Sequence, residues 1–167
     1  NCPEQEKEFH CEAEAMSVMD HPYILKIYDY GEVEGFPYIV LDYVARGTLH
    51  EVMQEFNFDE KGIASMAVML CQALSYAHDL GYVHRDIKPD NIMIADDWSP
   101  RIMDFGLAVD SNDPDYEYKA VGSLGYAAPE VRNTPEKVDH RVDIYALGGV
   151  IYTMLTGVIP DAEDADF

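Results

Sequence analysis

The sequence predicts an α+β fold. An early pair of segments alternates apolar with polar side chains and is rich in β-branched and aromatic residues, as strands are. Two later segments repeat apolar residues at the spacing of a helix. Both strands and helices are therefore expected, and 48% apolar with 26% charged residues are ordinary globular values.

The first expected elements are a helix and two strands. Residues 4–20 are expected to be helical, and "DHPY" ends this helix because the residue before a proline avoids the helical conformation. Residues 24–35 and 36–44 are expected to form strands around the turn "EVEG". A short helix then begins near Thr48, a residue type that caps helices. The inward face of the first helix is Phe9, Ala13 and Met16.

The clearest helix of the chain follows. It is expected to run from Asp59, as the N-terminal cap, to about Leu80, and Gly81 stops it. "NIMIA" and "PRIMDF" then form short strands around the turn "DDWS". Residues 106–129 show no period, and the last helix spans roughly Asp139 to Thr156. The inward stripe of the long helix is Ile63, Met66, Ala67, Leu70, Leu74 and Ala77.

The charge of the chain excludes several partners. Thirty-two Asp and Glu against eleven Lys and Arg give a formal net charge of −21, which repels nucleic acid and anionic membranes. The longest apolar run, from Ile144 to Ile159, is shorter than the roughly 20 residues that span a bilayer. The three Cys fit no metal pattern, and buried or reduced thiols are typical of a reducing compartment. We therefore expect no nucleic-acid partner and no membrane segment in this chain.

One polar segment carries most of the chemistry. "HRDIKPDN", residues 84–91, lies between two apolar runs, and "DFG" follows it closely. Asp86 and Asn91 are five positions apart with Lys88 between them, and Asp104 opens "DFG". Phosphoryl transfer needs a carboxylate that orients the attacking hydroxyl, an amide and a second carboxylate that hold Mg²⁺, and a lysine that stabilises the moving charge. These four residues are the candidates for those roles.

With "APE" at 128–130 and "VDIYALGGVIYTMLTG" near the end, these motifs stand in the order found in protein kinases, and the sequence resembles bacterial serine/threonine kinases of the eukaryotic (Hanks) type. The resemblance implies a kinase-like fold with a partial N-lobe at residues 1–44 and a partial, mostly helical C-lobe at residues 45–167. It also implies ATP, Mg²⁺ (or Mn²⁺) and a protein substrate with a Ser or Thr acceptor.

The resemblance assigns catalytic roles by position. Asp86 matches the catalytic base, and Lys88 matches the lysine that distinguishes serine/threonine from tyrosine kinases. Asn91 and Asp104 match the metal ligands. Ser123, in "GSLGY", matches the hydroxyl that bridges the base and the substrate. The stacked column that joins the lobes corresponds to Met16, Ile27, His84 and Phe105, and Asp143 matches the residue that anchors it by bonding the catalytic loop.

The resemblance also assigns ATP contacts. Glu12 matches the acid that pairs with the ATP-clamping lysine, and Glu14 is the competing residue. Leu41 would be the gatekeeper of a hinge that grips adenine through the peptide groups of Asp42 and Val44. The two remaining contacts are a ribose contact and the apolar floor under adenine, for which the candidates are Thr48 and Met93.

The family pattern is incomplete in three places. No glycine-rich loop and no ATP-clamping lysine precede Glu12, and the partner arginine of Glu130 is absent, so we expect a fragment of a kinase domain, truncated at both ends and with little activity by itself. Between Asp104 and Gly122 there is no Thr. A carboxylate of this stretch is therefore expected to pair with Arg85 in place of a phosphorylated residue.

Two other functions remain open. A pseudokinase or nucleotide-binding scaffold would fit if the upstream lysine were missing, although Asp86, Asn91 and Asp104 argue against it. A small-molecule phosphotransferase such as an aminoglycoside kinase shares the spacing of base and Asn, whereas "APE" favours a protein substrate. The catalytic part is expected to face the cytoplasm, and the full-length protein could carry a membrane anchor.

Overall fold

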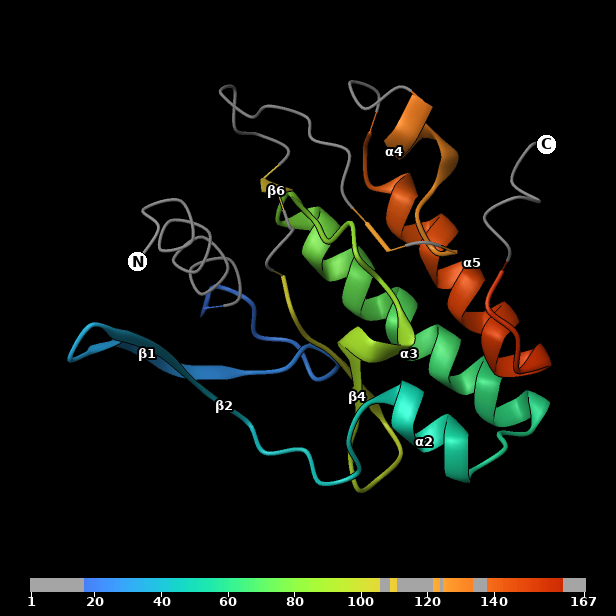
Figure 1. Cartoon of the computed structure of the whole chain (residues 1–167), viewed down its shortest axis with the longest axis horizontal. Helices are drawn as coiled ribbons and strands as arrows, with labels where there is room; N and C mark the ends of the chain where they lie inside the picture. Colours follow the sequence, from blue (N-terminus) through green and yellow to red (C-terminus); the bar gives the residue numbers. More distant parts are fainter. Residues whose placement is uncertain (1–16, 106–108, 111–121, 124, 134–137, 161–167) are drawn as a thin grey trace.

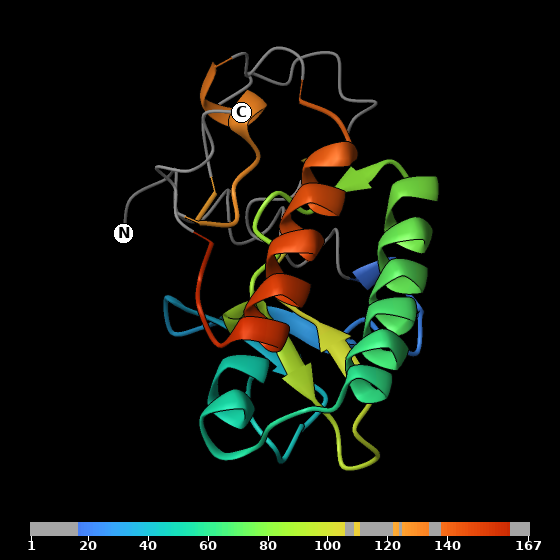
Figure 2. The ribbon, with the colours of Figure 1, turned by 90° about the vertical axis from the view of Figure 1, so that its right-hand side faces the viewer.

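The computed structural model describes residues 17–105, 109–110, 122–123, 125–133 and 138–160. A β-hairpin projects from one side of the molecule, and two long helices pack side by side on the other (Figures 1 and 2). The predicted α+β class is thus confirmed. The division into two lobes between residues 44 and 45 stays a prediction.

The hairpin consists of β1 (Ile27–Val33) and β2 (Phe36–Leu41), which pair antiparallel. Glu34 and Gly35 form its two-residue turn, with φ angles of 54° and 83°. Two positive φ angles match the right-handed twist of the strands, and they explain why a glycine stands in this turn. Both strands and the turn are where the sequence predicted them, although the strands are shorter.

The helix α2 (Leu49–Glu55) begins at the predicted cap. The Thr48 hydroxyl accepts the backbone N–H of Glu51 at 3.2 Å, and the Glu51 carboxylate accepts the N–H of Thr48 at 2.8 Å. This reciprocal pair satisfies two backbone donors that the first turn of a helix leaves free. The prediction of a helix capped by Thr48 is confirmed.

The helix α3 (Glu60–Asp79) forms one wall of the core. Asp59 caps it by accepting the Gly62 N–H at 2.8 Å, and Gly81 ends it with a φ of 92°. The predicted stripe is wrong at one position. Ala67, at the edge of the apolar face, is half-buried, and Ala73, which the prediction omits, is buried. The buried residues are Ile63, Met66, Leu70, Ala73, Leu74 and Ala77.

In the second half of the chain, short strands come first and two helices follow. After α3 it forms β3 (Tyr82–Val83), the 3-10 turn η1 (Pro89–Asn91), β4 (Ile92–Ile94), β5 (Pro100–Ile102), β6 (Val109–Asp110), α4 (Pro129–Asn133) and α5 (Arg141–Thr156). β4 pairs with β5 and β3 with β6, both antiparallel. The last helix starts two residues later than predicted, because the Asp139 carboxylate accepts the N–H of Arg141 at 2.9 Å and so precedes the first turn.

The core lies between α3, α5 and the β4–β5 pair, and Figure 2 shows the two helices side by side. Its fully buried side chains include Leu49, Leu70, Leu74, Ile87, Ile92, Ile94, Ile102, Phe105 and Val150. Ile87 belongs to the polar segment 84–91, so that segment is tied directly into the core.

Several predictions concern other parts of the chain. The helix at residues 4–20, with Glu12, Glu14 and Met16, lies outside the described residues except at its end, where Ser17 is the last helical residue. Most of residues 106–121 also lie outside them, including the carboxylates expected to pair with Arg85. Cys71 is a free thiol and is exposed rather than buried. Among the described residues, no helix combines the length and hydropathy that a bilayer span requires.

Candidate active site

The segment 84–91 connects β3 to β4 and is held by a carboxylate of α5. Asp143, fully buried, accepts the backbone N–H of His84 at 2.9 Å and that of Arg85 at 2.8 Å. His78, in the last turn of α3, bonds the same carboxylate at 2.7 Å. The prediction that Asp143 anchors this loop through its backbone is confirmed.

The anchor offsets backbone strain. Arg85 adopts a φ of 66°, in the left-handed region. For a residue with a side chain this conformation costs about 1–2 kcal/mol. A hydrogen bond to a charged group contributes about 1.5–3 kcal/mol. The bonds to Asp143 therefore outweigh the strain and fix the direction in which the next residue, Asp86, leaves the loop.

His84 fills the space beneath the loop. Its Nδ1 accepts the Asp86 N–H at 3.2 Å, and its Nε2 lies 3.1 Å from the Met103 carbonyl. A neutral imidazole with its proton on Nε2 satisfies both bonds. The ring also lies 4.6 Å from that of Phe105, centroid to centroid. The described part of the predicted column is therefore in contact at His84 and Phe105, while Ile27 is half-buried against the core.

Asp86 collects three polar side chains. Its Oδ2 accepts the Lys88 ammonium at 2.7 Å and the Asn91 amide at 3.0 Å. Its Oδ1 accepts the Ser123 hydroxyl at 2.7 Å, and Lys88 also donates to Ser123 at 2.7 Å. Asp86 itself is only 9% exposed. The structure thus brings together all four residues that the sequence assigned to catalysis.

Ser123 reaches Asp86 because its segment packs closely on the loop and on α5. A Cβ on Gly122, whose φ is 136°, would lie 3.3 Å from the Arg85 carbonyl oxygen, so glycine permits this approach. The Tyr126 hydroxyl bonds Thr153 of α5 at 3.2 Å. Burial raises the pKa of Tyr126, so this phenol stays neutral and available for that bond.

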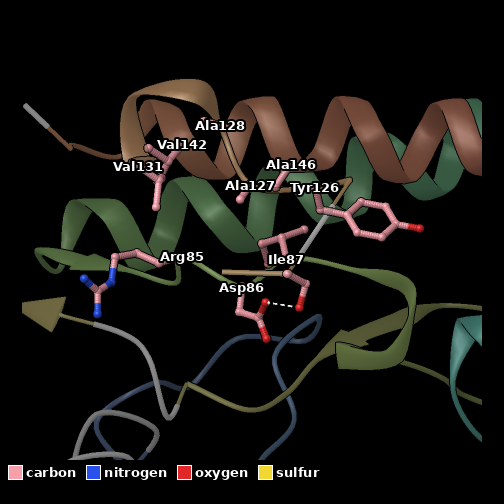
Figure 3. A pocket seen from close by; sticks show the side chains of 10 residues that line it. Arg85, Asp86, Ile87, Tyr126, Ala127, Ala128, Val131, Val142 and Ala146 are labelled. Carbon is pink, nitrogen blue, oxygen red and sulfur yellow. Dashed lines mark hydrogen bonds between the residues drawn. The ribbon is translucent and has the colours of Figure 1, made fainter. Parts of the chain in front are cut away.

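A small pocket lies beside the Asp86–Ser123 bond, as Figure 3 shows. Its polar side is Asp86 and Ser123, and its wall is apolar and comes from the loop, residues 126–131 and α5. The lining residues are Arg85, Asp86, Ile87, Ser123, Tyr126, Ala127, Ala128, Val131, Val142 and Ala146. The Asp86 carboxylate therefore faces a partly apolar, partly polar concavity.

Asn91 and Asp104 fit a shared Mg²⁺ site. The Asn91 amide nitrogen donates to the Asp86 carboxylate and carbonyl, which leaves its side-chain oxygen for a metal. The Met103 N–H donates to the Asn91 carbonyl at 3.0 Å, so Asp104 directly follows a residue bonded to Asn91. Asp104 is exposed, with a φ of 63°. One carboxylate and one amide oxygen are a donor set that Mg²⁺ accepts when phosphates and water complete it.

Of the predicted ATP contacts, the structure places two side by side. Thr48 and Met93 are bridged across neighbouring backbones. Leu41 is 39% exposed at the end of β2, and Val44 packs against the core. The Asp42 N–H donates to the Lys26 carbonyl at 3.0 Å, so an adenine contact at Asp42 would use its carbonyl oxygen. Thr48 already caps α2, and its ribose contact stays a prediction.

Two positioning residues were missed by sequence reasoning. His78 and Tyr126 hold Asp143 and the Ser123 segment, as described above. A signal existed for His78, since it stands in the last turn of a helix whose inward face passes through Leu74 and Ala77. No spacing rule connects Tyr126 to Thr153, because 27 residues separate them and only the packed fold brings them together.

Comparison with known proteins identifies the family. Residues 2–166 match the family described as protein kinase domain. The chain is 38% identical over 166 residues to the serine/threonine-protein kinase PknB of Mycobacterium tuberculosis, covering 94% of this chain and 26% of that protein. It is 42% identical over 162 residues to the probable serine/threonine-protein kinase CA_C1728 of Clostridium acetobutylicum, covering 95% and 24%. The chain thus spans about a quarter of the length of these relatives.

The match and the geometry agree. Every motif on which the resemblance was based falls within the matched residues. One hydrogen-bonded cluster joins Ser123 to three residues that lie more than 30 positions before it in the chain, namely Asp86, Lys88 and Asn91. This chain belongs to the protein kinase domain family.

Proposed function

We propose that the protein containing this chain transfers the γ-phosphoryl group of ATP to Ser or Thr hydroxyls of proteins. The observation that carries the proposal is the buried Asp86 carboxylate, bonded at once to Lys88, Asn91 and Ser123. The relatives whose names say serine/threonine-protein kinase support the acceptor type. The lysine in "DIKPDN" supports it independently.

Three side chains of this chain have separate roles in the proposed phosphoryl transfer. Asp86 accepts the proton of the substrate hydroxyl while the oxygen of that hydroxyl forms a bond to the γ-phosphorus. The bond between the γ-phosphorus and the bridging oxygen breaks at the same time, and ADP leaves with that oxygen. Ser123 occupies one lone pair of Asp86 and so fixes the carboxylate plane. Lys88, bonded to Asp86 and Ser123, places a positive charge beside the transferring group.

Asn91 and Asp104 would hold Mg²⁺. When bound there, the ion would supply positive charge that neutralises the phosphates. This role matters in a chain of net charge −21, whose field opposes the approach of ATP. The nucleotide is proposed to contact Leu41, the Asp42 carbonyl, Val44, Thr48 and Met93. Glu12 is proposed to pair with a lysine of the full-length protein.

The test compares the full-length protein with its Asp86→Asn variant. Both are incubated with γ-labelled ATP and a generic basic protein that offers Ser and Thr. A general base contributes about 10²–10⁴-fold, so we expect the variant to lose that much in kcat while its thermal unfolding is nearly unchanged. Equal rates in both proteins would overturn the proposal.

Two further measurements separate the alternatives. Phosphorylation of an aminoglycoside or another small alcohol in preference to the basic protein would favour a small-molecule phosphotransferase. Binding of ATP by the parent protein without any phosphorylated product would favour a nucleotide-binding scaffold. Acid hydrolysis of the product identifies phosphoserine and phosphothreonine, and phosphotyrosine alone would contradict the acceptor assignment.

A further inference from the structure

Three aromatic side chains gather at the surface, away from the site described above. The aromatic cluster consists of Phe56 and Phe58, in the connection from α2 to α3, and Trp98, in the turn between β4 and β5. Their ring centroids lie 4.7 Å apart for Phe56–Trp98, 5.3 Å for Phe56–Phe58 and 5.9 Å for Phe58–Trp98. Both connections lie at the lower end of the molecule in Figures 1 and 2.

Two of the three rings are exposed, and the third, Phe58, is half-buried against the core. Phe56 is 46% and Trp98 36% exposed. Trp98 has a φ of 66°, in the left-handed region that a bulky residue rarely adopts. An exposed aromatic residue held in a strained turn needs an explanation that core packing does not give.

Trp98 already binds a cation. The Arg46 guanidinium lies 4.1 Å from the centre of the Trp98 ring, and its Nη2 donates to the Asp96 carbonyl at 3.2 Å. Arg46 is itself exposed, so this contact can open without disturbing the core. The ring face and the Asp96 carbonyl together form a receptor for a guanidinium group.

The rim of the cluster is acidic. Asp96 and Asp97 precede Trp98, and all of the acidic residues that flank the three rings in sequence are exposed. Hydrogen bonds from Ser99 hold the pKa of Asp97 below its usual range, so this carboxylate stays charged. Around the cluster there are two basic residues, Arg46 and Lys61, and five acidic ones. The acidic residues are Glu55, Asp59, Glu60, Asp96 and Asp97. The charge therefore favours a basic partner and opposes nucleic acid, anionic lipid and a second copy of this acidic chain.

We propose that the aromatic cluster is a docking site for a basic segment of a partner protein, in which an arginine replaces Arg46 on Trp98 and an apolar side chain contacts Phe56. The site is separate from phosphoryl transfer and does not depend on the proposed function. Aromatic anchors inside a charged rim are the composition that protein interfaces favour.

The test measures binding to the full-length protein. The probe is a fluorescein-labelled ten-residue peptide with four arginines around a Leu–Phe pair and no Ser, Thr or Tyr. Fluorescence anisotropy is recorded at low and high salt. We expect saturable binding that weakens about 5- to 30-fold in Trp98→Ala, the range of a partly desolvated cation–π contact, and much less in Trp98→Phe. Glu55→Gln with Asp96→Asn should reduce the salt dependence.

A matched control excludes other sites. Tyr43→Ala removes an aromatic residue that is 90% exposed outside the cluster and should leave the affinity unchanged. Circular dichroism confirms that each variant is folded.

Three results would overturn the docking site. The first is an unchanged affinity in Trp98→Ala. The second is equal binding of a peptide whose arginines are glutamines. The third is a sedimentation measurement in which the parent protein forms a dimer through this surface and Trp98→Ala is monomeric, since the occupant would then be a second copy.

Discussion

The segment 84–91 with its neighbours and the β1–β2 hairpin both contain aspartate and aromatic side chains. Around the segment some of these side chains are fully buried, whereas at the hairpin they are half-buried or exposed. Around the loop, Asp143 is fully buried and its carboxylate accepts three hydrogen bonds from two other elements. Directly after the hairpin, Asp42 accepts one hydrogen bond at 2.8 Å, from the exposed Tyr28 hydroxyl of β1. Tyr28 is 61% and Phe36 75% exposed, whereas the aromatic residue beside the loop, Phe105, is 1% exposed.

This difference teaches where side-chain identity matters. A polar group in the buried region has no water to replace a lost partner, so each deletion leaves an unsatisfied group. A polar group on the hairpin exchanges its partner for water at little cost. The roles proposed for the hairpin agree with this, because Asp42 and Val44 would contact adenine through backbone groups that tolerate changes of side chain.

The largest contrast is predicted for the two aspartates. Asp143→Ala removes the acceptor of three hydrogen bonds and leaves the Arg85 strain uncompensated, so we expect a loss of about 3–5 kcal/mol in the free energy of unfolding and loss of phosphotransfer. Asp42→Ala should change the free energy of unfolding by less than about 0.5 kcal/mol. Urea unfolding of the full-length protein measures both, and similar losses in the two variants would contradict the comparison.

The same contrast explains what the sequence could predict. Helix ends at Thr48, Asp59 and Gly81 follow from local capping chemistry, and the motif residues Asp86 and Asn91 follow from local spacing. The distant contacts did not follow. His78 meets Asp143 across 65 residues, and no periodicity encodes that distance. Ala73 is buried and Ala67 is half-buried because the helical spacing gives the stripe but not which of its edges the neighbouring elements cover.

Two lysines provide the next contrast. Lys88→Met removes the ammonium that bonds both Asp86 and Ser123, each at 2.7 Å. We expect kcat to fall about 10- to 100-fold, the equivalent of a charged hydrogen bond of about 1.5–3 kcal/mol. Lys26→Met removes an exposed ion pair with Asp20 and should leave kcat unchanged. Steady-state phosphorylation assays give both values, and a fall confined to KM would contradict a role for Lys88 in the transition state.

Two tyrosines test the comparison at a smaller scale. Tyr126→Phe removes a buried hydrogen bond to Thr153 and should destabilise the protein by about 1 kcal/mol. Tyr28→Phe removes an exposed bond to Asp42 and should have almost no effect. Thermal unfolding compares them directly. If Tyr28→Phe proved the more destabilising, burial would not be the property that separates the two regions.

The smallest predicted effect lies where the segment that precedes β1 contacts α3. His21 stacks on Tyr76 of α3, with centroids 5.2 Å apart, and its Nδ1 accepts the Tyr23 N–H at 3.2 Å. Burial lowers the pKa of His21 below the ordinary histidine value of 6.5. The folded protein therefore binds fewer protons than the unfolded chain just below pH 6.5, and its stability should fall as the pH decreases through that value.

Replacing the histidine isolates this contribution. Parent protein and His21→Gln are unfolded with urea at pH 7.5, 6.5 and 5.5, and the difference between their free energies of unfolding is followed. Because glutamine does not titrate in this range, the parent should lose stability relative to the variant as the pH decreases. A difference that stays constant would mean that His21 packs equally well with and without its proton. The contact between His21 and α3 would then tolerate a change of charge, as the exposed hairpin does and the buried segment 84–91 does not.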